Sequence, residues 1–88
     1  MKNKETVSIM KALGNETRLK IYNLLSEKPL CGYLILDKLE INQPTLSHNM
    51  KILCDAGLVK AEKDWKWIYY SQNKVKIKEL ILALENLN

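Results

Sequence analysis

The chain has 88 residues, of which 47% are apolar and 27% are charged, and its formal net charge is +4. This length fits one domain, residues 1–88, and so small a domain gains stability by pairing with a second copy. No apolar run approaches the roughly 18 residues that a membrane-spanning helix needs, and the start of the chain lacks the apolar stretch of a secretion signal. Two cysteines are too few for the disulfide framework of a small secreted protein, so we expect free thiols and a cytoplasmic location.

Two helices are predicted at the start of the chain. Apolar residues at helical spacing indicate a first helix over residues 5–13, which Gly14 ends. Asn15 is a suitable cap for a second helix, which we expect to run to about Glu27 because Pro29 follows. The two helices are therefore joined by a very short connection.

A helix-turn-helix is predicted next. Residues 30–31 form a short extended piece, and a third helix covers residues 32–39. A tight turn at residues 40–41 leads to the cap Asn42 of a fourth helix. That helix ends at Gly57, because glycine readily adopts the left-handed conformation found after helix ends.

A hairpin and a last helix complete the chain. Residues 58–63 alternate in character and residues 67–71 are rich in strand formers, so the turn at 64–66 makes them a β-hairpin. Asn73 caps a final helix with one apolar stripe. The predicted fold is mainly α with a small β-hairpin, a winged helix-turn-helix of order α-α-α-α-β-β-α.

The fourth helix has one polar face suited to hydrogen bonding with DNA. At about 100° per residue, Leu46, Met50 and Leu53 face the core, and the opposite side carries an amide, hydroxyls, an imidazole and an ammonium group. Glutamine can bond adenine in two places, hydroxyls can donate or accept, and lysines contact phosphates. An isolated helix of this kind would simply be solvated, but here it lies between a helix-turn and a wing. The predicted DNA contacts are Gln43, Thr45, Ser47, His48, Lys51, Lys63 and Lys66.

The sequence gives no indication of an enzyme. His48 is the only histidine and has no nucleophile or carboxylate at a suitable spacing, and no Gly-x-Ser-x-Gly motif, phosphate-binding loop or paired carboxylates occur. The positive charge suits double-stranded DNA as a partner, although it is spread evenly and only Arg18 is an arginine.

Four segments carry a resemblance to the ArsR/SmtB family of metal-responsive repressors. They are residues 12–21 (ALGNETRLKI), 43–53 (QPTLSHNMKIL), 56–59 (AGLV) and 67–71 (WIYYS). The resemblance implies a homodimer joined by the first and last helices, an operator of two-fold symmetry, and release of DNA when a ligand binds. The residues expected in the dimer interface are Val7, Met10, Ile77, Leu80, Ile81, Leu84 and Leu87.

The cysteines depart in part from the family's metal sites. Family members often carry Leu-Cys-x-Cys-Asp-Leu at the third helix, whereas this chain keeps Cys31 and has Tyr33 in place of the second thiol. The family's other site needs a histidine on the last helix, which this chain lacks. The surroundings of Cys31 and Cys54 are similar to the arsenic-responsive branch, so we expect arsenite or antimonite as inducer, with a third ligand from elsewhere. No cofactor is expected to be needed for folding.

Two alternatives stay open. One is a DNA-binding regulator of the same family without metal sensing, controlled by thiol oxidation or otherwise. The other is a protein–protein interaction module, which would call for apolar or acidic residues where the fourth helix has polar neutral ones. A further departure is Trp65 at the wing turn, where the family usually has glycine.

Overall fold

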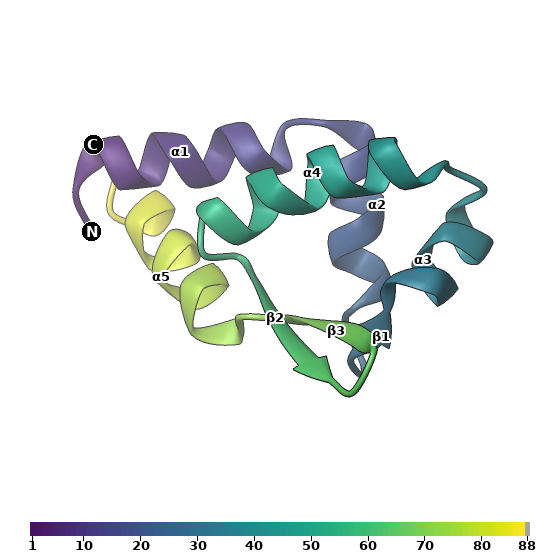
Figure 1. The fold of residues 1–88 in the computed structure, drawn as a ribbon. Coiled ribbons are helices and arrows are strands. Elements are labelled where there is room, and N and C mark those ends of the chain that lie inside the picture. The colour runs from purple at the N-terminus through teal and green to yellow at the C-terminus, as the bar shows by residue number, and fades with distance from the viewer. Residues whose placement is uncertain (88) are drawn as a thin grey trace.

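A computed structural model describes residues 1–87, which form five helices and one three-stranded antiparallel sheet (Figure 1). The predicted mainly helical, winged helix-turn-helix architecture is confirmed. Helices α1 and α5 lie side by side at the end of the molecule that holds both termini, α3 lies at the other end, and the hairpin extends from the bottom of the view in Figure 1. Among these residues, no helix has the length and apolar character needed to cross a membrane. The elements are α1 (Asn3–Leu13), α2 (Glu16–Leu24), β1 (Leu30–Cys31), α3 (Gly32–Leu39), α4 (Gln43–Asp55), β2 (Val59–Asp64), β3 (Trp67–Gln72) and α5 (Lys74–Glu85).

The predicted helix caps are confirmed. The side chains of Asn15, Asn42 and Asn73 each accept a hydrogen bond from the backbone N–H three residues later, which satisfies a donor that the first helical turn leaves free. Gly57 has a φ of +77° and ends α4 as predicted. The N–H groups of Gly57 and Leu58 donate to the carbonyls of Cys54 and Leu53, the paired bonds of a Schellman motif.

Two elements differ from the prediction. Helix α2 ends at Leu24, before Glu27, because the N–H groups of Leu25 and Ser26 bond carbonyls only three residues back and the helix tightens and stops. The extended piece β1 is a third strand of the sheet, antiparallel to β3, rather than an isolated connection. The sheet order is β1-β3-β2, so the start of the helix-turn-helix is hydrogen-bonded to the wing.

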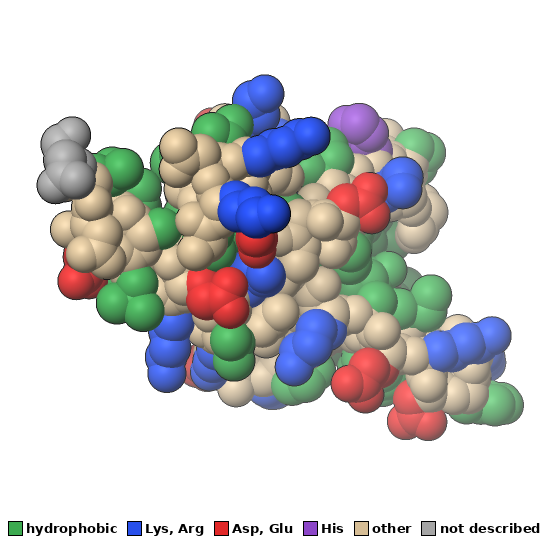
Figure 2. All heavy atoms as spheres, turned by 90° about the vertical axis from the view of Figure 1, so that its left-hand side faces the viewer, with side chains coloured by type: hydrophobic (Ala, Val, Ile, Leu, Met, Phe, Trp, Pro, Cys, Tyr) green, Lys and Arg blue, Asp and Glu red, His purple; other side chains and the backbone are tan. Residues whose placement is uncertain are grey.

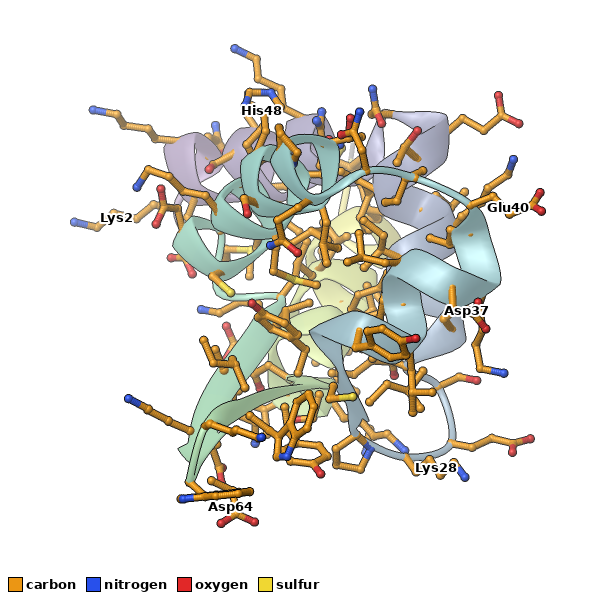
Figure 3. All side chains as sticks on the ribbon, turned by 45° about the vertical axis from the view of Figure 1, so that its right-hand side comes forward. Lys2, Lys28, Asp37, Glu40, His48 and Asp64 are labelled. Atoms are coloured by element: carbon orange, nitrogen blue, oxygen red, sulfur yellow. The ribbon has the colours of Figure 1, made fainter. Side chains whose placement is uncertain are left out.

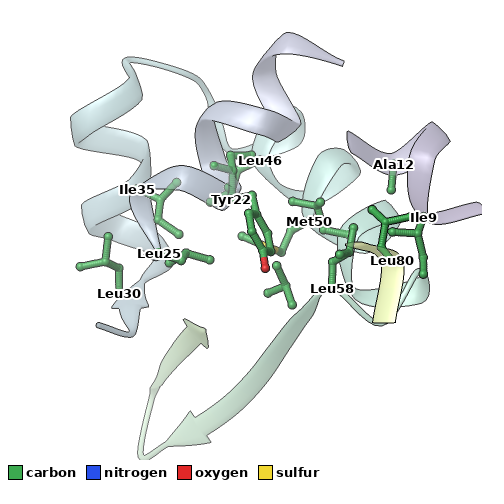
Figure 4. Close-up of a cluster of buried hydrophobic side chains, with 13 residues drawn as sticks. Ile9, Ala12, Tyr22, Leu25, Leu30, Ile35, Leu46, Met50, Leu58 and Leu80 are labelled. Carbon is green, nitrogen blue, oxygen red and sulfur yellow. The ribbon is translucent and has the colours of Figure 1, made fainter. Parts of the chain in front are cut away.

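One continuous core holds the helices and the base of the sheet together. Leu46, Met50 and Leu53 point inward from α4, as predicted, and are at most 3% exposed. In Figure 4, Leu46 and Met50 lie in the same cluster as Tyr22 of α2 and Ile35 of α3. The core therefore fixes which face α4 turns outward. The side chains with least exposure are Ile9, Ile21, Leu25, Ile35, Leu46, Leu53 and Leu58.

Helix α5 carries apolar residues on more than one face. Leu80 is only 5% exposed and packs in the core of its own chain, so its assignment to a dimer interface needs correction. Ile77 also packs against this core. Leu84 remains 39% exposed, and the structure exposes Val75 and Leu82 as well, which the predicted stripe did not include. An exposed apolar surface thus remains on α5 after the chain has folded.

An ion pair joins α5 to α1. The ammonium of Lys76 donates a 2.8 Å hydrogen bond to the Glu5 carboxylate and lies 3.6 Å from that of Glu79. The hydrogen bond from Lys76, with its charge, lowers the pKa of Glu5, and the bond to Glu5 raises the pKa of Lys76. The two helices at this end of the molecule are therefore held in register by charge as well as by packing.

Candidate nucleic-acid interface

The outward face of α4 carries most of the predicted DNA contacts. Gln43, Ser47, His48 and Lys51 are all exposed, and the Gln43 amide donates a 3.0 Å hydrogen bond to the Ser47 hydroxyl one turn later. Both side chains are therefore oriented by each other, while their remaining donors and acceptors face solvent. Thr45 is half-buried at the edge of this face. The structure thus brings the five predicted α4 residues together on the first two-thirds of one helix.

The N-terminus of α4 is also free to meet an anion. Asn42 caps it through a 2.9 Å bond to the N–H of Thr45, and Pro44 has no N–H to satisfy. The first turn contains no acidic residue. A helix start of this kind favours a phosphate group close by, because of its free N–H groups and its dipole.

The inner face of α4 is anchored by a polar contact that sequence reasoning missed. The guanidinium of Arg18 donates to the carbonyl of Ala12 at 2.6 Å, to that of Lys11 at 3.3 Å, and to the Asn49 side-chain oxygen at 3.0 Å. Asn49 is 6% exposed, and its amide donates to the carbonyl of Thr45 at 2.9 Å. We call these five residues the Arg18 clasp. It ties the end of α1 and the start of α2 to the helix that carries the polar face.

Two features of the sequence are consistent with this clasp. Arg18 is the only arginine of the chain, and Asn49 is a polar residue on the inward side of an otherwise apolar helix face. A buried amide needs a partner, and an arginine can satisfy several acceptors at once. Their separation of 31 positions in sequence hid the pairing.

The hairpin and α4 lie toward the same side of the molecule. Figure 2 shows the single histidine and the protruding hairpin on its right-hand side, and Figure 3 shows His48 at one end of that surface and Asp64, beside the hairpin turn, at the other. Lys63 and Lys66 are exposed on the hairpin. A single duplex lying against this side would meet α4 and the hairpin tip at two separate places.

Acidic neighbours partly neutralise the positive charge of this surface. The ammonium of Lys51 lies 3.1 Å from the carboxylate of Asp55, and both side chains are well exposed. Glu62 and Asp64 stand beside Lys63 on the hairpin. Phosphate attraction at this surface is thus local, through individual lysines, rather than the effect of a broad basic patch.

The two cysteines belong to different elements, Cys31 to β1 and Cys54 to α4. Cys31 pairs in register with Tyr69, and because neighbouring strand residues point to opposite faces, Tyr70 points to the other side. Cys54 packs against the core near Tyr70, whose pKa is raised by burial and, to a smaller extent, by that thiol. Burial, with help from Asp55, also raises the pKa of Cys54. The Cys31 side chain and the Tyr70 ring, near which Cys54 packs, therefore lie on opposite faces of the sheet.

The rest of residues 1–87 offers no ready-made ion site. No three side chains among histidines, cysteines, aspartates and glutamates in this part of the chain are grouped so that they could hold a metal ion. Arsenite takes three thiol ligands, so the donor set within one chain does not fit it without ligands from outside.

Comparisons with known proteins agree with this geometry. Residues 15–61 match the family described as bacterial regulatory protein, arsR family. The chain is 40% identical over 87 residues to an HTH-type transcriptional regulator of Methanocaldococcus jannaschii, covering 98% of each protein. It is 39% identical over 88 residues to an arsenical resistance operon repressor of Staphylococcus aureus, covering 100% of this chain and 85% of that one. A homodimeric winged helix-turn-helix DNA-binding domain from Mycobacterium bovis superposes with a TM-score of 0.80 at 27% identity, covering 92% of this chain and 76% of that one.

Proposed function

Since the chain belongs to the ArsR family of DNA-binding transcriptional regulators, which are not enzymes, we propose that it is a homodimeric repressor of a two-fold symmetric operator. The observation that carries this proposal is the exposed face of α4, where Gln43, Ser47 and His48 stand on a helix fixed from behind by the core and the Arg18 clasp. A rigid helix with hydrogen-bonding side chains fits the width of the major groove and can distinguish its base pairs. We place the protein in the cytoplasm, where DNA is accessible.

The predicted contacts divide into two classes. Gln43, Thr45 and Ser47 can reach base edges, because they lie on the first two turns of α4. His48 lies on the same face and meets either a base or a phosphate. Lysine ammonium groups contact phosphates, which position the protein without reading sequence. In this proposal Lys51 contacts the duplex beside α4, and Lys63 and Lys66 contact it beside the hairpin.

Salt dependence is expected to identify the phosphate contacts. Replacing Lys51, Lys63 or Lys66 by alanine should each lower the slope of log affinity on log salt concentration by about 0.9, because each contact releases roughly one condensed counterion. The measurement is fluorescence anisotropy with a duplex that the wild-type protein has selected from a random-sequence pool. Lys20→Ala is the matched control, since Lys20 is exposed on α2 and pairs only with Glu16 at 3.5 Å.

The same assay distinguishes residues that contact bases from residues that contact phosphates. Gln43→Ala or Ser47→Ala should reduce the preference for the selected duplex over random DNA while leaving the salt slope unchanged. If all three lysine variants keep the wild-type slope and both α4 variants keep the wild-type preference, this side of the molecule does not bind DNA. The α4 surface would then serve a protein partner.

The similarity to an arsenical resistance repressor supports a thiophilic inducer. Cys31 is the thiol that we favour as its ligand, because it is half-buried at the start of α3 and at the edge of the sheet, directly before the helix-turn-helix. Cys54 is less suitable, because its raised pKa disfavours the thiolate that soft ions bind. The remaining ligands would come from the second subunit, from water or from an external thiol.

An operator-release titration tests the inducer. We expect arsenite to weaken operator binding by wild-type protein by a factor within the usual range of about 5 to 150, and Cys31→Ser to abolish this response with nearly normal DNA affinity. Cys54→Ser is measured in parallel, in a phosphine-reduced buffer without competing thiols. A Cys31→Ser/Cys54→Ser protein that still responds like wild type would show that the thiols do not sense the ion. A wild-type protein that binds DNA but ignores arsenite, antimonite, zinc and cadmium would favour the regulator without metal sensing.

A further inference from the structure

The tip of the hairpin presents a large aromatic side chain to solvent. Trp65 is 76% exposed, the highest exposure among the large hydrophobic residues of residues 1–87. It is the first residue of the two-residue turn that joins β2 to β3, since Asp64 pairs with Trp67. Packing within the chain does not explain a tryptophan here, because so little of its surface is covered.

The backbone of Trp65 also has an unusual conformation. Its φ is +59°, in the left-handed region, whereas Lys66 is not among the residues with positive φ. Glycine is the usual residue where a hairpin turn needs a positive φ, because a Cβ atom crowds the backbone there. The folded chain therefore holds a bulky residue at a position where a small one would be easier to accommodate.

A lysine lies against the ring. The ammonium of Lys66 lies 4.7 Å from the centre of the Trp65 ring and 5.4 Å from that of Trp67. Both distances fall within the range of cation–π attraction. One side of the Trp65 ring is thus next to a positive charge, and most of the remaining surface is free to contact another molecule.

We propose that Trp65 is a minor-groove wedge, inserted into the operator beside the base pairs that α4 contacts; this inference rests on the DNA-binding function proposed above. The hairpin tip and α4 lie toward the same side but at separate ends of it, so a duplex with α4 in its major groove meets the tip in a neighbouring groove. The minor groove, about 6 Å wide, excludes a helix but admits a single flat side chain. Lys66 would then lie against the phosphates that border this groove.

The small net charge of the hairpin leaves room for an apolar contact beside the phosphate contacts of its lysines. The stretch from Lys60 to Lys66 contains three lysines and two acidic residues, Glu62 and Asp64, so the local net charge is small. Apolar side chains inserted from the minor groove unstack a base step and bend the duplex, and flexible pyrimidine–purine steps resist this least. Trp65 would thus select for deformable sequence on both flanks of a two-fold operator, without hydrogen bonds to bases.

The decisive variant is Trp65→Gly, because glycine accepts the positive φ and should leave the hairpin intact. We expect it to bind the selected duplex about tenfold more weakly, and to bend it less in a fluorescence energy-transfer assay with end-labelled DNA. Tyr33→Gly would disturb α3, so the control is Tyr33→Ala, which removes another aromatic of 68% exposure. Tyr33 lies on α3 and not at the hairpin turn, so this variant should leave DNA affinity unchanged. Circular dichroism confirms that both variants are folded.

A second measurement places the ring directly. The chain has two tryptophans, so in Trp67→Phe protein all tryptophan emission comes from Trp65. On adding the selected duplex, this emission should become protected from acrylamide, and 2-aminopurine at one of the flanking steps should brighten as the step unstacks. If the Trp67→Phe protein binds the duplex while Trp65 stays fully quenchable, and Trp65→Gly binds as tightly as wild type, the wedge alone is overturned. Wild-type protein that binds no duplex would overturn the DNA-binding function itself.

Discussion

Replacing Leu84 by aspartate is expected to convert the protein from a dimer to a monomer that no longer holds its operator. Leu84 is 39% exposed on α5, and Ile81 on the same helix face is exposed as well. Leu87, which follows the end of α5 at Glu85, is also exposed. An unpaired carboxylate in an apolar interface costs several kcal/mol, and a two-fold interface contains it twice. We therefore expect the dimer dissociation constant to rise by at least about 1000-fold, as measured by sedimentation equilibrium.

The matched control is Leu34→Asp, the same substitution at a similar exposure of 41% on α3. It should leave the dimer intact, because α3 lies away from the end of the molecule where α1 and α5 meet. Circular dichroism separates loss of pairing from loss of fold. Leu82→Asp distinguishes between the two apolar faces of α5. If Leu82→Asp is a monomer and Leu84→Asp remains a dimer, the interface is the face that carries Val75 and Leu82.

Local signals in the sequence located most helix boundaries correctly. Asn15, Asn42 and Asn73 were predicted as caps and accept the expected bonds, because a cap depends only on residues within one turn. The end of α4 at Gly57 was predicted for the same reason, since one residue type readily adopts the left-handed conformation. Such features depend on the local sequence and require no tertiary contacts.

Features that depend on distant contacts were missed or assigned wrongly. Strand β1 has two residues and exists through its pairing with β3, about forty positions later, so its own sequence gives no strand pattern. Leu80 belongs to the same apolar stripe as Leu84, and helical spacing alone could not tell which of them the chain buries for itself. The pairing of Cys31 with Tyr69, rather than with the Tyr70 that lies near Cys54, likewise became apparent only from the register of the sheet.

The candidate site divides in the same way. The polar face of α4 could be predicted, because helical periodicity opposite Leu46 and Met50 defines it. The Arg18 clasp and the approach of Lys66 to the rings of Trp65 and Trp67 could not, because both require side chains to meet in space. Periodicity thus predicts the outward polar face of α4, but not the residues that hold this helix in place.

Removing the Arg18 side chain is expected to cause the largest loss of stability of any single polar substitution considered for this chain. In Arg18→Met the carbonyls of Lys11 and Ala12 lose a charged donor, and the buried oxygen of Asn49 is left without one. Hydrogen bonds to charged groups contribute about 1.5–3 kcal/mol, and an unsatisfied buried group costs about 1–3 kcal/mol. We expect the free energy of unfolding to fall by about 2–4 kcal/mol, measured by urea denaturation at fixed protein concentration.

Two further variants establish whether the clasp itself is responsible. Lys20→Met removes a neighbouring positive charge whose only partner is Glu16 on the exposed surface, so it should change the free energy by less than about 0.5 kcal/mol. Arg18→Met/Asn49→Leu removes both partners of the 3.0 Å hydrogen bond. This double variant should recover part of the lost free energy of unfolding, because no buried amide oxygen is then left without a donor. Strict additivity of Arg18→Met and Asn49→Leu would mean that the 3.0 Å contact does not couple α2 to α4, and the rigid support of the polar face would have to be sought in the apolar core alone.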